Sequence, residues 1–102
     1  MVTRDKLNVI IPLYNPHAGW EDHFIEHLQE LRDELKETEM SVILVNDGST
    51  IQLPGIDGIM DRFRYLHYYS YPVNKGKGYA IRYGINISDA DYYIYKIGRA
   101  HV

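Results

Sequence analysis

Cysteine is absent from this sequence of 102 residues, which excludes disulfide bonds and metal sites built on thiolates. Long apolar runs are also absent: none approaches the roughly 20 residues that a membrane-spanning helix needs. The first six residues lack the apolar region of a signal peptide. We therefore expect a cytoplasmic chain without a membrane segment, which could be the soluble part of a longer, membrane-associated protein.

A strong excess of charge is missing as well, because the formal net charge is only −3. The charge is unevenly placed, however. The segment 73–88 contains Lys75, Lys77 and Arg82 and no acidic residue. This local excess indicates a small anionic ligand near the segment rather than a basic surface for nucleic acid, which we do not expect as a partner.

The apolar residues that are present make up 45% of the chain, enough for the core of one small domain. Short apolar runs predict strands at 7–11, 40–46, 64–69 and 92–95, the first of them stopped by Pro12. Helical periodicity predicts helices over 19–37 and 78–88, and a short one near 59–63. The longest helix carries an apolar stripe of Trp20, Phe24, Leu28, Leu31 and Leu35. Alternating strands and helices predict an α/β fold with an open parallel sheet and helices on both faces.

The stretch 41–50 organises the chain, because a strand buried on both faces ends abruptly in Asn-Asp-Gly-Ser. Ligands of open α/β sheets bind just outside the carboxyl ends of the strands. Asp47 is expected there as an unpaired carboxylate, and it is the first candidate for ligand binding. In the alternative interpretation, Asp47 only caps the turn by accepting a bond from a nearby backbone N–H.

The sequence Asn-Lys-Gly-Lys-Gly at 74–78 opens the last predicted helix. Glycines let backbone N–H groups approach a ligand, and a helix N-terminus with two lysines favours negative charge. The spacing matches neither G-x-x-x-x-G-K-[ST] nor G-x-G-x-x-G. A glycine-rich turn with solvated lysines is the alternative.

Two further patterns are interpreted as structural. His23 to His27 matches H-x-x-E-H, a zinc-peptidase pattern, but no third ligand is identifiable and an amphipathic helix accounts for the segment. Asp89-Ala90-Asp91 has the form D-x-D. It precedes the last strand, so we expect it in a helix-to-strand turn at the opposite edge of the sheet from Asp47.

Three ordered motifs then become specific together: Val-Ile-Ile-Pro-Leu-Tyr-Asn at 9–15, Val-Asn-Asp-Gly-Ser-Thr at 45–50 and Asn-Lys-Gly-Lys-Gly-Tyr-Ala-Ile-Arg at 74–82. Over roughly residues 6–95 the chain resembles the N-terminal half of a family 2 glycosyltransferase with a GT-A fold. The resemblance implies a Rossmann-like sheet of about four strands in the order 3-2-1-4. It also implies a UDP- or GDP-linked sugar donor, transfer of the sugar to an acceptor, and a divalent cation, Mn²⁺ or Mg²⁺.

The resemblance also implies residues that contact the nucleoside. Pro12 and Tyr14 look like the loop that lines the base and the ribose. Asp47 resembles the acid that hydrogen-bonds the nucleoside, and a carboxylate can accept from a base N–H or a ribose hydroxyl.

On the phosphate side, Asn74, Lys77 and Arg82 match the family's segment beside the ribose and the diphosphate. Cations at this place would balance the diphosphate charge. The resemblance identifies no catalytic residue within the chain.

The family's metal-binding D-x-D should follow Tyr95, where this chain reads Lys96 to Val102 and stops. The acceptor half is also missing. We therefore expect residues 1–95 to be the nucleotide-diphosphate-sugar-binding part of a GT-A domain, truncated before its metal site and inactive alone. Ile-Gly-Arg-Ala-His-Val at 97–102 matches the translation of a common sequencing adapter, so we expect the tail 96–102 to be non-native.

Two other functions stay open. A receiver-like module would use Asp47 as a phospho-acceptor, but it needs an acidic pair after the first strand, where this chain has Tyr14 and Asn15. An interaction module would use the tyrosine-rich strand at 64–69. In the truncated glycosyltransferase domain, the uncharged strand 92–95 would form a sheet edge at which a second copy could pair.

Overall fold

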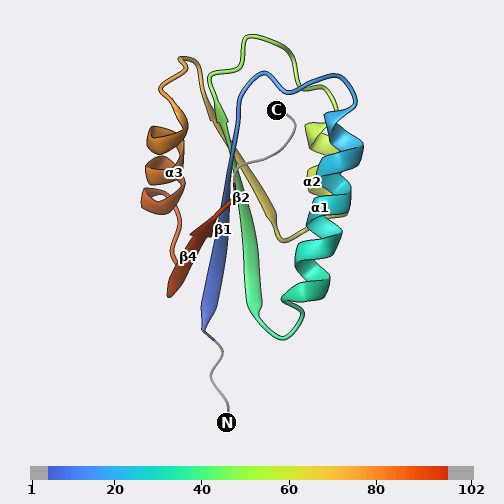
Figure 1. Cartoon of the computed structure of the whole chain (residues 1–102), viewed down its shortest axis with the longest axis vertical. Helices are drawn as coiled ribbons and strands as arrows, with labels where there is room; N and C mark the ends of the chain where they lie inside the picture. Colours follow the sequence, from blue (N-terminus) through green and yellow to red (C-terminus); the bar gives the residue numbers. More distant parts are fainter. Residues whose placement is uncertain (1–4, 97–102) are drawn as a thin grey trace.

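The computed structural model describes residues 5–96 (Figure 1). The elements follow in the order β1 (Lys6–Leu13), α1 (Trp20–Glu34), β2 (Glu39–Asp47), α2 (Ile56–Arg62), β3 (Leu66–Tyr71), α3 (Lys77–Asn86) and β4 (Tyr92–Tyr95). Apart from Lys96, the expected non-native tail lies outside the described residues. The four strands pair in parallel in the order β3-β2-β1-β4, which confirms the predicted sheet.

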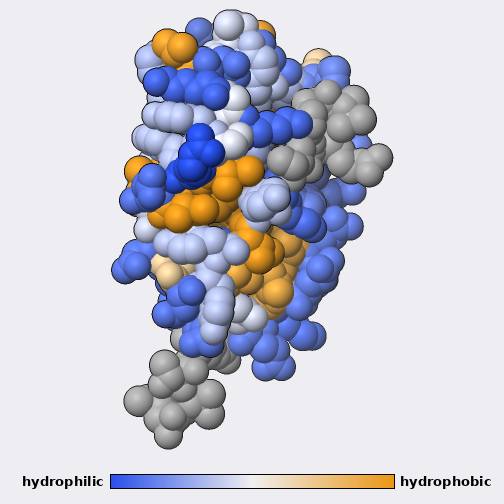
Figure 2. Space-filling model, turned by 60° about the vertical axis from the view of Figure 1, so that its left-hand side comes forward, coloured by the Kyte–Doolittle hydropathy of each residue, from blue (hydrophilic) through white to orange (hydrophobic). Residues whose placement is uncertain are grey.

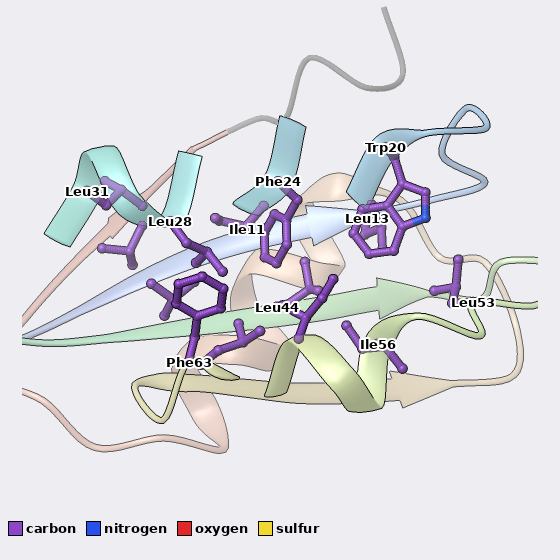
Figure 3. Packing of buried hydrophobic residues seen from close by; sticks show 14 of the residues in the cluster. Ile11, Leu13, Trp20, Phe24, Leu28, Leu31, Leu44, Leu53, Ile56 and Phe63 are labelled. Atoms are coloured by element: carbon purple, nitrogen blue, oxygen red, sulfur yellow. The ribbon is translucent and has the colours of Figure 1, made fainter. Parts of the chain in front are cut away.

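Helices cover both faces of this sheet: α1 and α2 lie on one side and α3 on the other (Figure 1). The core of the first face forms between β1, β2 and the apolar stripe of α1 (Figure 3). The predicted stripe is confirmed over Trp20, Phe24, Leu28 and Leu31, which are all buried. Leu35 is half-buried and ends the helix. None of the helices in the described range is long and apolar enough to cross a membrane.

A smaller core joins α3 to the other face, where Ile10, Ile43, Val45 and Ala80 are buried together. The helix approaches the sheet closely at Gly84. A Cβ there would lie 2.8 Å from Cγ2 of Ile10, a separation at which something must shift. The missing side chain of Gly84 therefore sets how near α3 lies to β1 and β2.

The prediction that Pro12 stops the first strand is wrong, because β1 continues through Pro12 to Leu13. The backbone carbonyls of Lys6 and Ile10 accept hydrogen bonds from Asp91 and Lys96, at the two ends of β4. The backbone N–H and C=O groups of even-numbered residues in β1 therefore point toward β4. Pairing with β4 ends at the Ile10–Tyr95 position. At Pro12 the missing N–H therefore faces a position where β4 has already ended, and no ladder hydrogen bond is lost.

Candidate functional site

A pocket of about 260 Å³ lies at the carboxyl edge of the sheet. Its lining comes from the ends of β1 and β2 and from the start of α3: Pro12, Leu13, Tyr14, Asp47, Asn74, Gly76 and Lys77. Five of the six residues predicted from the sequence are thus brought together. They converge because the carboxyl ends of parallel strands meet at one edge of the sheet.

The sixth predicted residue, Arg82, is exposed and does not line the pocket. It lies one turn further along α3, and its guanidinium points back toward the start of the helix. Nη1 of Arg82 lies 3.4 Å from where a Cβ of Gly78 would be. Arg82 therefore adds positive charge beside the first turn of α3, next to the pocket rather than in its wall.

Asp47 is not the unpaired carboxylate that the sequence predicts; that expectation is wrong. Its side chain is only 2% exposed, and both oxygens accept two hydrogen bonds each. Oδ1 accepts from the hydroxyl of Tyr71 at 2.6 Å and from the backbone N–H of Lys75 at 2.9 Å. Oδ2 accepts from Nδ2 of Asn74 at 2.8 Å and from the backbone N–H of Gly76 at 2.9 Å. A carboxylate offers about four acceptor positions, and all are used.

These bonds also differ from the capping alternative. The backbone donors lie 28 and 29 residues further along the chain rather than in the turn that follows Asp47. Asp47 therefore fixes the connection between β3 and α3 against the end of β2. Gly48 allows the same approach, because with φ 66° it takes a left-handed conformation and a Cβ there would overlap the backbone of Val73 and Asn74.

The N-terminus of α3 opens onto the pocket. Helix geometry leaves the backbone N–H groups of its first turn, among them those of Gly78 and Tyr79, without an intrahelical carbonyl. Together with the helix dipole, these groups favour an anion at this end. Lys75, which the sequence analysis included in the anion-binding motif, instead places Nζ 4.9 Å from the ring centre of Tyr79.

The opposite wall is held by Asn15. Its backbone N–H donates to Oγ of Ser49 at 2.9 Å, and its Oδ1 accepts from the backbone N–H of Thr50 at 2.8 Å. These bonds join the loops that follow β1 and β2, and they accompany a positive φ of 42° at Asn15. The preceding residue, Tyr14, is thereby held at the pocket with 42% of its surface exposed.

Tyr71 lies beside the site, although it falls outside the strand that the sequence predicts at 64–69. In the structure it is the last residue of β3 and pairs in register with Asp47, the last residue of β2. Burial, followed by the hydrogen bond to Asp47, raises the pKa of Tyr71, so its hydroxyl stays protonated and donates. The sequence carries no local signal for this contact, because it depends on the register between β2 and β3.

The two patterns interpreted as structural, H-x-x-E-H and D-x-D, both lie within the described residues. Within residues 5–96, no group of three or more His, Asp or Glu side chains could hold a metal ion. In the H-x-x-E-H segment, Nδ1 of His27 lies 3.9 Å from Glu30, one turn along the same helix. Asp91 accepts a 2.8 Å bond from the backbone N–H of Lys6, which places it at the amino edge of the sheet, away from Asp47.

The burial of Asp47 also bears on the receiver-like alternative. A phospho-acceptor carboxylate needs an oxygen that is open to an incoming phosphoryl group. Here both oxygens are bonded inside the protein and the residue is 2% exposed. The geometry therefore disfavours phosphoryl transfer to Asp47.

Comparison with known proteins agrees with the resemblance read from the three motifs. A family model described as glycosyl transferase family 2 matches residues 8–95. The structure of the mannosyltransferase PcManGT from Pyrobaculum calidifontis, in complex with GDP-Man and Mn²⁺, matches with a TM-score of 0.74 and 18% identity. S. aureus TarS 1–349 matches with a TM-score of 0.69 and 24% identity. No curated protein sequence matches this chain.

The two structural matches cover 93% and 90% of this chain but only 28% and 27% of the matched chains. At these identities the structural likeness shows the fold alone, which is of the GT-A type. The family match covers nearly all of the described residues, from Asn8 to Tyr95. Fold, motif order and family model agree, and the chain belongs to glycosyl transferase family 2.

Proposed function

We propose that residues 1–95 bind a nucleotide-diphosphate sugar, linked to UDP or GDP, and serve glycosyl transfer to an acceptor. One observation carries the proposal: a single pocket at the carboxyl edge gathers Pro12, Tyr14, Asp47, Asn74 and Lys77. The N-terminus of α3 opens onto the same place. Polar recognition groups and an anion-favouring helix end therefore meet in one concave site.

The nucleoside would occupy the part of the pocket beside β1. Pro12, Leu13 and Tyr14 offer apolar surface for a base and a ribose. The volume of about 260 Å³ is slightly below the roughly 300–1,000 Å³ of complete small-molecule sites. A pocket of this size suits the nucleoside part of the donor, with the phosphates extending beyond it.

The diphosphate would extend toward α3. The backbone N–H groups at the start of the helix, the side chain of Lys77 and the guanidinium of Arg82 supply donors and positive charge there. Asp47 and Asn74 would then have two tasks. They hold the segment 74–76 against the end of β2 through the bonds described above, and both residues belong to the lining of the pocket.

A divalent cation, Mn²⁺ or Mg²⁺, is part of the proposal, because PcManGT is described in complex with GDP-Man and Mn²⁺. Residues 5–96 offer no cluster that fits a metal. We therefore assign no described residue to the cation and no step to it.

Binding measurements on charge variants test the proposal. Lys77→Ala and Arg82→Ala should each weaken UDP and GDP binding by about tenfold, because a charge-assisted hydrogen bond contributes about 1.5–3 kcal/mol. Neither change should affect uridine or guanosine, which lack phosphates. Isothermal titration calorimetry measures all four ligands.

Lys36→Ala and Arg64→Ala are matched controls, because both side chains are exposed and neither lines the pocket. They should leave every affinity unchanged. Equal losses for UDP and uridine in the site variants would remove the phosphate role. An unmodified chain that binds neither diphosphate would refute the proposal and leave the interaction-module alternative.

A further inference from the structure

We infer that Tyr71 is a positioning residue for the nucleotide site: its hydroxyl holds Asp47, and its ring holds the start of α3 against that carboxylate. This inference rests on the proposed function and deepens it. Tyr71 lines no part of the pocket itself. It would act through the residues that do.

The hydroxyl of Tyr71 is bonded to the carboxylate of Asp47. Tyr71 donates to Oδ1 of Asp47 at 2.6 Å, a short bond typical of a hydroxyl and a carboxylate. The same oxygen accepts the backbone N–H of Lys75. Tyr71 and the segment that leads into α3 are therefore bonded to one atom, so a rotation of the Asp47 carboxylate would disturb both contacts.

The ring of Tyr71 packs against α3. It contacts two residues of α3 that are one turn apart, Tyr79 at a centroid distance of 5.4 Å and Tyr83 at 5.1 Å, both edge to face. Tyr79 and Tyr83 in turn stack on each other at 6.4 Å. One side chain thus joins the end of β2, the end of β3 and the first turns of α3.

The hydroxyl of Tyr71 stays protonated, because its surroundings raise its pKa. Burial and the bond to Asp47 raise the pKa of Tyr71, so the hydroxyl is a donor throughout the physiological pH range. Asp47 has four donors for four acceptor positions, and Tyr71 is the only one of the four that is not in the segment 74–76. It is therefore the contact by which β3 holds the carboxylate to which this segment is bonded.

Tyr71→Phe tests the inference, because it removes the hydroxyl and keeps the ring. We expect UDP affinity to fall by about tenfold in calorimetry. Tyr65→Phe is the matched control: its hydroxyl donates to the backbone carbonyl of Leu28 at 3.0 Å, on the face of the sheet away from α3. It should lower thermal stability to a similar extent and leave UDP affinity unchanged.

Amide hydrogen exchange separates positioning from general stability. In Tyr71→Phe the backbone N–H groups of Lys75 and Gly76 should exchange faster relative to the core amide of Val9, and in Tyr65→Phe they should not. Unchanged affinity and unchanged exchange at these two residues would overturn the inference. If the unmodified chain binds no nucleotide, the proposed function fails, while the exchange result still decides whether Tyr71 holds the segment.

A measurement on the unmodified chain keeps the inference testable even if Tyr71→Phe does not fold. The hydroxyl proton of Tyr71 should give a slowly exchanging NMR resonance, because it is bonded to a buried carboxylate, and this resonance should shift when UDP is added. A hydroxyl that exchanges with water as fast as that of the exposed Tyr92 would contradict the inference.

Discussion

Asp47 is the residue on which the site depends, because it is both buried and bonded to the segment 74–76 that leads into α3. Its four donors come from β3 and from the segment 74–76. A buried group with this many partners is expensive to alter, since each donor left unpaired costs about 1–3 kcal/mol. The site and the fold are therefore coupled at this one side chain.

Asp47→Asn should for that reason lower both stability and binding. The amide oxygen can replace only one carboxylate oxygen, and the amide NH₂ then faces two donors. We expect the free energy of unfolding to fall by about 1–3 kcal/mol and UDP affinity to fall by about tenfold. Urea denaturation and calorimetry measure the two quantities, with the exposed Asp61→Asn as the control.

Unchanged stability in Asp47→Asn would show that the four hydrogen bonds contribute little. A loss of stability with UDP affinity unchanged would make Asp47 purely structural. Only a loss of both supports the two tasks proposed for this carboxylate.

Individual residues were predictable from the sequence where local chemistry decides their role. Lys77 and Asn74 belong to a motif whose glycines and lysines indicate a helix start, and the structure places both at the pocket. The partners of Asp47 were not predictable, because they lie 24 to 29 residues away and depend on strand register. Tyr71 was missed for the same reason.

Among the elements, α3 brings Lys77 to the pocket. Gly84 sets how near this helix lies to the sheet. In Gly84→Ala the new Cβ would meet the buried Ile10, whose branched side chain has little room to move. We expect a loss of about 1–3 kcal/mol in the free energy of unfolding, typical of overpacking.

Gly58→Ala in α2 is the matched control, since nothing lies within 4 Å of its added Cβ. Alanine is the better helix former, so this variant should gain about 0.5–1 kcal/mol. Urea denaturation compares the two variants. A gain in stability for both would show that α3 can move away from the sheet without loss.

The existence and type of the elements followed from the sequence, because the buried strands are apolar runs and α1 has a clear helical stripe. The ends of elements did not. Pro12 reads locally as a stop, yet it is tolerated in β1 since its side of the strand has no partner at that point. The short helix near 59–63 begins earlier, at Ile56, because Leu53 and Ile56 also pack into the core.

At the scale of the whole molecule, the described sheet ends in β4, where Tyr92, Ile94 and Tyr95 are exposed. Figure 2 shows hydrophobic side chains gathered on the face that carries α3 and β4. No charged residue lies within Tyr92–Tyr95 to discourage pairing with another strand. Self-association through this edge stays a prediction, and it is independent of the pocket at the carboxyl edge.

We propose that the carboxyl edge of this sheet binds the nucleotide, and an NMR titration locates the binding site on the chain. Adding UDP or GDP to the ¹⁵N-labelled chain should shift the backbone amides of Tyr14, Asp47 and residues 74–78, all at the carboxyl edge. The amides of Lys6 and Asp91, at the amino edge, should not move. Saturating nucleotide that leaves the first group unshifted, or that shifts the second group instead, would contradict the account.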